Sequence, residues 1–163
     1  MKTTSNVAKD HIATAIKDLE AALTGGNAHA SFDDAVRDLP HDLLGAVPAG
    51  LPYSIWQLVE HIRITQWDIL EFSRNPHHTS PHWPDDYWPK RRGKAEEWDR
   101  SVEGFFHSLR KVEDLVLDEK RDLLAPFPWG EGHTLLREAL LAIQERRAPD
   151  PFGWTREVMT LTV

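Results

Sequence analysis

The histidine in the stretch SIWQLVEHIRITQWDIL, His61, is the first residue whose type and position could do chemistry. The stretch has the spacing of an amphipathic helix, and His61 lies at the edge of its apolar stripe, about 100° around the axis from Ile62. Thr65 and Asp68 project on the same side. A histidine placed in this way usually hydrogen-bonds a neighbour or faces solvent, whereas a zinc or nickel ion needs three or more protein ligands. The residues alone therefore favour a structural role for His61 and leave metal ligation open.

The other histidines give weaker signals. His77, His78 and His82 lie in the segment HHTSPH, where neighbouring prolines exclude the i, i+4 helical spacing that fixes two imidazoles on one ion, so we expect them on the surface. His133 precedes Thr134 at the start of a predicted helix and could help to cap it. The chain has no glycine-rich phosphate loop, H-E-x-x-H motif or G-x-S-x-G motif, and the spacing of its serines and histidines does not indicate a hydrolytic triad.

Composition limits the classes of protein that the chain can represent. Its 163 residues suit one domain, and the hydrophobic content of 40% with 28% charged residues is typical of a globular protein. The net charge of −7 argues against nonspecific nucleic-acid binding, which needs basic surface. The absence of cysteine excludes disulfides, thiolate metal sites and a cysteine nucleophile. No apolar run resembles a signal peptide or a membrane span, so we expect a cytoplasmic protein.

Four segments have the periodicity of amphipathic helices. They span about residues 12–23, 54–75, 94–118 and 134–148. Ser54 and Gln57 have the spacing of a capping box, which predicts where the second helix begins. In the last helix we expect five residues to face inward: Leu135, Leu136, Ala139, Leu140 and Ile143.

Strand signals are poor, because only the final VMTLTV is rich in β-forming residues and it has no evident partner. We therefore predict an all-α fold, a four-helix bundle with a long first crossover that contains a short helix in SFDDAVRDLP. Residues 1–163 form a single domain in this prediction, with an atypical C-terminal tail at 142–163. The proline-rich segment 75–93 is expected to form a rigid flap over one end of the bundle. Many of the seven tryptophans lie in or beside loops, which predicts that these loops pack down or line a pocket.

The order of these segments resembles the DinB-like family of four-helix bundles, which includes DNA-damage-inducible proteins. The resemblance rests on SIWQLVEHIRITQWDILEF, SPHWPDDYWP and DLLAPFPWGEGHTLLREALL, and it covers roughly residues 5 to 141. It implies that His61 is the first ligand of a divalent metal. Two further ligands in the family come from an H-x-x-x-H pair on the last helix, whose spacing places both on one face. Family members are proposed to use such a site for hydrolysis or for transfer of thiol cofactors.

The sequence departs from this pattern after REALL. It reads AIQERRAPDPFGWTREVMTLTV, without a histidine, and Glu145 and Pro149 stand where the pair would fall. The three-histidine site is therefore incomplete, unless packing brings His107 or His133 close to His61. A degenerate family member, an altered reading frame and a rebuilt C-terminus all remain open as the origin of this tail.

Two functions follow as expectations. The first is a DinB-like protein with an incomplete metal site, no cofactor and a binding or structural role. The alternative is a divalent-metal-dependent hydrolase or thiol-cofactor transferase that holds zinc or nickel at His61 with recruited ligands. We also expect a homodimer, because a shortened last helix leaves apolar surface to cover. A small-molecule ligand fits either function, whereas nucleic-acid and membrane partners are not expected.

Overall fold

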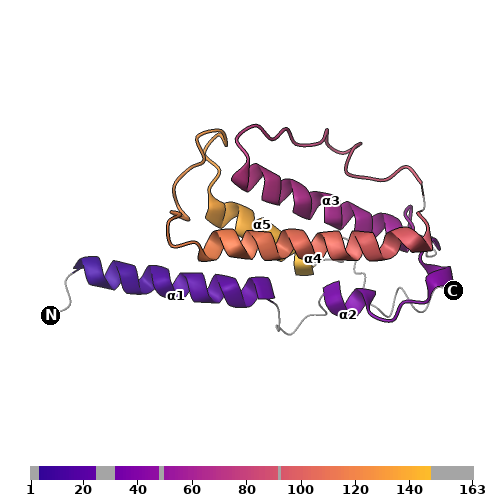
Figure 1. Ribbon diagram of the computed structural model, residues 1–163, viewed down its shortest axis with the longest axis horizontal. Helices are drawn as coiled ribbons and strands as arrows, with labels where there is room; N and C mark the ends of the chain where they lie inside the picture. The colour runs from indigo at the N-terminus through magenta and orange to yellow at the C-terminus, as the bar shows by residue number, and fades with distance from the viewer. Residues whose placement is uncertain (1–3, 25–31, 48–49, 92, 148–163) are drawn as a thin grey trace.

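The computed structural model describes residues 4–24, 32–47, 50–91 and 93–147, and the regular elements within them are helices (Figure 1). The elements are α1 (Thr4–Thr24), α2 (Phe32–Val36), the 3₁₀ helix η1 (His41–Leu43), α3 (Ile55–Arg74), α4 (Ala95–Leu117) and α5 (Leu135–Arg147). The described residues contain no strand, and a single antiparallel bridge joins Pro126 and Thr134. The predicted all-α bundle with a long first crossover is confirmed, while the VMTLTV segment lies outside the described residues.

Helix α3 begins where the sequence predicts. The Gln57 backbone N–H donates to Ser54 Oγ at 3.2 Å, and the Ser54 N–H donates to Gln57 Oε1 at 2.9 Å, which completes the capping box. The helix ends at Arg74, because Asn75 has an extended backbone and Pro76 cannot continue the hydrogen-bond ladder. The predicted boundaries at Ser54 and Asn75 are both confirmed.

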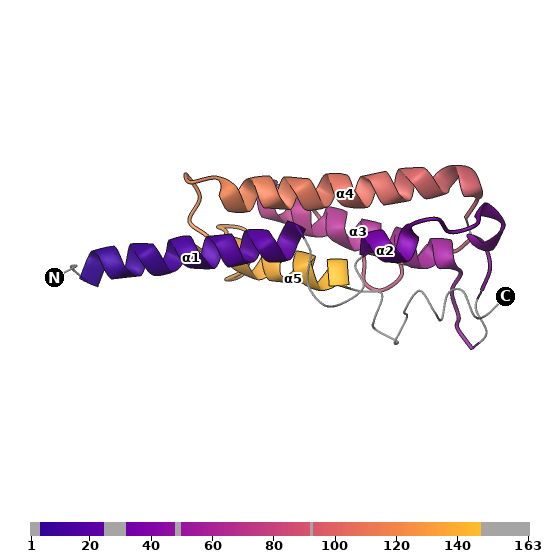
Figure 2. The ribbon, with the colours of Figure 1, turned by 90° about the horizontal axis from the view of Figure 1, so that it is seen from below.

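Helices α3 and α4 form the centre of the bundle, α5 packs against both of them, and α1 packs against α4 and α5 (Figure 2). The sequence predicts an apolar stripe on α4, formed by Trp98, Val102, Phe105, Leu109, Val112 and Val116. This stripe faces the core, where Phe105 and Val112 are fully buried. The short helix α2 is held there by Phe32, whose ring centroid lies 4.1 Å from that of Phe105. None of the described helices is long and apolar enough to cross a bilayer.

The prediction that Leu140 faces inward is wrong. Leu135, Ala139 and Ile143 are buried, but Leu140 is 52% exposed. Leu140 borders a groove of about 570 Å³ that α1 and α5 leave between them, so helical periodicity placed it too close to the core. The N-terminal half of α1 extends beyond the other helices in both ribbon views (Figures 1 and 2), and Ile12 there is half exposed.

Residues 75–91, here called the strap, connect α3 to the beginning of α4. The prediction that this segment covers one end of the bundle is wrong, because the strap runs back along the whole length of α3 (Figure 1). It covers a flank of the helix instead. Gly93 follows the strap, at a φ of +78°, and a Cβ there would lie 2.0 Å from an atom of the Trp56 ring. The chain can pass this close to α3 because glycine has no side chain.

Candidate ligand pocket between α3, the strap and α5

The strap is fastened to α3 at three positions on one face of the helix. The Gln57 side-chain amide donates to the Pro89 carbonyl at 2.7 Å. One turn further on, His61 Nδ1 lies 3.0 Å from the Tyr87 carbonyl oxygen. The third fastening is Asp68, which contacts His78 near the beginning of the strap and the Tyr87 hydroxyl near its end. Residues spaced by four and seven share one face of a helix, which explains why an extended segment can follow α3 in this way.

His61 packs against the strap rather than facing solvent. Its ring stacks on Trp88 with 3.8 Å between centroids and 7° between planes. Burial lowers the pKa of the His61 imidazole, and the hydrogen bond to the Tyr87 carbonyl partly opposes that shift. The imidazole is therefore held neutral near pH 7, with Nδ1 as the protonated nitrogen that donates to the carbonyl.

Asp68 joins two residues of the strap through both of its carboxylate oxygens. His78 Nε2 lies 2.7 Å from Oδ1, and the Tyr87 hydroxyl donates to Oδ2 at 2.6 Å. Burial and then the Asp68 carboxylate raise the pKa of the Tyr87 phenol, which therefore keeps its proton and donates it. The expected surface position is wrong for His78, whose side chain is only 7% exposed, although His77 and His82 are exposed. The sequence could not show that the strap turns back onto α3.

A pocket of about 280 Å³ lies between α3, the strap, the turn before α5 and α5 itself. Its wall is mostly apolar, and a few polar groups converge on it. The residues that line it are Thr65, Asp68, Ile69, Phe72, Ser80, Trp83, Tyr87, His133, Arg137, Glu138, Leu141 and Glu145. Trp83 is 65% exposed at this site, a large solvent contact for an indole. The expectation that tryptophan-bearing loops line a pocket is confirmed for Trp83, while Trp88 packs on His61.

Helix α5 contributes two carboxylates to the pocket. Glu138 is buried, and its Oε1 accepts a hydrogen bond from the Arg137 guanidinium at 2.6 Å. His133 Nδ1 lies 3.3 Å from the same oxygen. The predicted capping role of His133 is wrong, because Thr134 Oγ1 accepts the hydrogen bond from the Arg137 backbone N–H at 3.2 Å. A histidine beside a threonine could not be separated from the true cap by sequence alone.

Glu145, two turns after Glu138, is the less satisfied of the two carboxylates. Within the described part of the chain it has no hydrogen-bond or ion-pair partner. Burial raises the pKa of its carboxyl group, since removal from water disfavours the charged form. The sequence placed Glu145 on the last helix at the expected metal site, but it gave no signal for Glu138.

The donor set does not fit the three-histidine metal site that the family resemblance implies. Among the described residues, no group of three or more histidine, aspartate or glutamate side chains is arranged to hold an ion. His107 is exposed on α4, and His133 lies against Glu138. Pro149 lies outside the described residues. The arrangement at His61 instead joins the helix to the strap.

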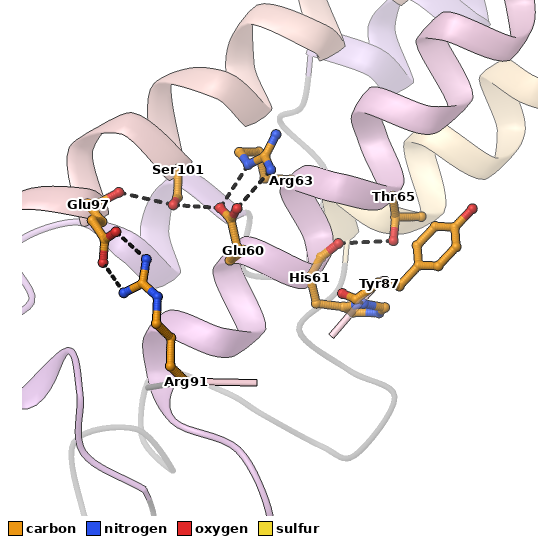
Figure 3. A network of polar contacts seen from close by, with 8 residues as sticks. All are labelled: Glu60, His61, Arg63, Thr65, Tyr87, Arg91, Glu97 and Ser101. Carbon is orange, nitrogen blue, oxygen red and sulfur yellow. Dashed lines mark hydrogen bonds and ion pairs between the residues drawn. The ribbon is translucent and has the colours of Figure 1, made fainter. Parts of the chain in front are cut away.

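The other flank of α3 carries a separate polar network (Figure 3). Glu60 accepts hydrogen bonds from Arg63 at 2.7 and 2.8 Å and from the Ser101 hydroxyl at 2.7 Å. Arg91 forms a fork-shaped ion pair with Glu97 and lies over the Trp56 ring, 5.2 Å from its centroid. A second depression, of about 440 Å³, is bordered by these groups. Each of the two carboxylates in this network already has a guanidinium partner.

The comparisons with known proteins agree with the fold. A profile of the DinB superfamily matches residues 27–155, most of the chain. The chain therefore belongs to the DinB superfamily. The match includes residues beyond Leu141, so the departure from the histidine pair lies inside the family domain. Searches of curated proteins and of solved structures gave no significant match.

Proposed function

We propose that this DinB-superfamily protein binds a small organic molecule in the pocket between α3, the strap and α5. The observation that carries the proposal is the combination of an apolar pocket of about 280 Å³, convergent polar groups and the exposed Trp83. Ligand sites are typically concave, largely apolar and equipped with a few polar groups that fix orientation. In this proposal the site works without a three-histidine metal ion.

His61 is a positioning residue in this proposal. Its hydrogen bond to the Tyr87 carbonyl and its stacking on Trp88 hold the strap against α3. Tyr87 and Trp83 belong to the strap and line the pocket. His61 would thus act on the pocket through the strap, without touching the ligand.

A fragment screen by protein-observed NMR tests the proposal. We expect hits that shift the Trp83 indole resonance and the α5 backbone resonances, and that bind at least about tenfold more weakly to Trp83→Ala. Because Trp83 is exposed, this variant should fold normally. Leu124→Ala is the matched control, since Leu124 is 58% exposed and lies outside the pocket. Hits that bind the wild type and Trp83→Ala equally would contradict the proposal.

Elemental analysis separates this function from the metal-dependent alternative. The protein is produced with added zinc or nickel, and the metal content of the wild type is compared with that of His61→Ala. We expect no stoichiometric metal in either. One equivalent of metal in the wild type that is lost in His61→Ala would favour a hydrolase or thiol-cofactor transferase instead.

A further inference from the structure

The charges around the pocket are predominantly negative. Three carboxylates line it, those of Asp68, Glu138 and Glu145, and among the described lining residues Arg137 is the single guanidinium. That guanidinium is engaged by Glu138 and half exposed. An anion that approached Arg137 would also meet the field of the other two carboxylates, so the charges disfavour an anionic ligand.

Aromatic rings form the complementary part of the wall. Trp83 and Tyr87 meet edge to face in the strap, with 5.3 Å between their centroids. Phe72 lines the pocket from α3, and its ring lies 5.3 Å from that of His133. The faces of aromatic rings attract cations, and sites that combine such rings with carboxylates recognise alkylated ammonium groups.

Glu145 is the carboxylate of the pocket whose charge is not yet compensated by a described neighbour. It lines the pocket from α5 and lacks a partner among the described residues. A carboxylate removed from water is costly unless a positive charge compensates it. A bound cation would provide that charge, while Asp68 and Glu138 are already satisfied by neighbouring donors.

We propose that the pocket selects an organic cation, an amine or quaternary ammonium group held between the Trp83 ring and the Glu145 carboxylate. This inference rests on the proposed function, because it names the class of ligand for the same pocket. The apolar wall suits the alkyl substituents of the cation, and the carboxylates set the sign of its charge.

Three probes of nearly equal shape test the sign of that charge. Choline is the cation, 3,3-dimethyl-1-butanol is its neutral counterpart and 3,3-dimethylbutanoate is the anion. We expect choline to bind at least about tenfold more tightly than the alcohol and the butanoate not to bind, as measured by NMR titration of the intact chain. The shifted resonances should be those of the Trp83 indole and of α5.

Two variants locate the binding. Glu145→Gln keeps the shape of the side chain, and we expect it to weaken choline about tenfold while it changes the affinity for the alcohol less than about twofold. Trp83→Leu should weaken choline by a similar factor. Glu103→Gln, an exposed substitution on α4, is the control that removes a charge elsewhere.

The outcomes separate this inference from the proposed function. If the alcohol binds as tightly as choline and depends on Trp83, the cation inference is overturned and the small-molecule pocket stands. If choline produces no shift, or shifts that neither variant reduces, the cation inference is also overturned. The fragment screen then decides independently whether the pocket binds any molecule.

Discussion

The two flanks of α3 carry ionisable groups that are arranged in opposite ways. Glu60 and His61 are neighbours in the sequence, yet Glu60 faces the network with Arg63 and Ser101, whereas His61 faces the strap (Figure 3). On the network flank each carboxylate is paired with a guanidinium. On the pocket flank Glu145 is partly buried and has no partner among the described residues. Paired charged groups stabilise the fold, whereas an unpaired and partly buried carboxylate indicates a place where a bound ligand could supply the missing partner.

The largest expected loss of stability is at Gly93, beside Trp56, and Gly132 near the pocket is the matched position without close packing. Gly93→Ala places a Cβ 2.0 Å from the Trp56 ring at a φ of +78°. We expect a loss of about 3 kcal/mol in the free energy of unfolding, from overpacking and backbone strain together. Gly132, near the pocket, has a φ of +91° with open space around it, and Gly132→Ala should cost about 1 kcal/mol. Urea denaturation measures both, and equal losses would contradict the difference in packing.

The second prediction breaks the network flank. Glu60→Gln replaces a carboxylate that accepts three hydrogen bonds, two of them from Arg63. We expect a loss of about 1–2 kcal/mol in the free energy of unfolding, because hydrogen bonds to charged groups are among the stronger ones and this pair is mostly shielded from solvent. Glu103→Gln on exposed α4 surface is the control, with an expected change within about 0.5 kcal/mol. A similar effect of the two substitutions would show that the network contributes little.

The third prediction has the opposite sign and concerns the pocket flank. Because burial raises the pKa of Glu145, its ionised form destabilises the fold at pH values above that pKa. Glu145→Gln should therefore increase the free energy of unfolding at pH 7, by less than Glu60→Gln decreases it. The gain should disappear as the pH falls below the unfolded-state pKa, where both states are protonated. Denaturation curves at pH 7 and pH 4 measure this difference, and destabilisation at pH 7 would show that Glu145 has a structural partner.

The smallest effect is expected at the exposed end of the network. The hydrogen bond from Arg91, with its charge, lowers the pKa of Glu97 from 4.5 to about 2. Its stabilising contribution is therefore present above pH 4.5 and is lost as the pH falls toward 2. Glu97→Gln should flatten this part of the stability profile, and 1 M salt should reduce the difference because the pair is exposed. Identical acid profiles for wild type and variant would contradict the assignment.

Elements dominated by local interactions could be predicted from the sequence. The capping box of Ser54 and Gln57 fixed the start of α3, and the stripe through Phe105 and Val112 identified the buried face of α4. The candidate site depends instead on contacts between residues distant in the sequence. That His78 reaches Asp68, and that Glu138 and Trp83 border one pocket, follows from the path of the strap, which no helical period encodes. Leu140 was misplaced for a related reason, because its exposure depends on how closely α1 approaches α5.

The fastenings of the strap also determine which part of the protein could be exchanged without disturbing the rest. Asp68 holds His78 and Tyr87, and the eight residues between these two carry Trp83 and Ser80 into the pocket. The Trp83 ring approaches His61 of α3, with 6.4 Å between centroids, but the hydrogen bonds to α3 come from residues outside this short segment. We therefore expect the composition of the segment to vary while the register of the strap on α3 stays the same. We also expect that residues 79–86 can be exchanged as one unit. Such an exchange would alter the ligand preference of the pocket and leave the helical bundle unchanged.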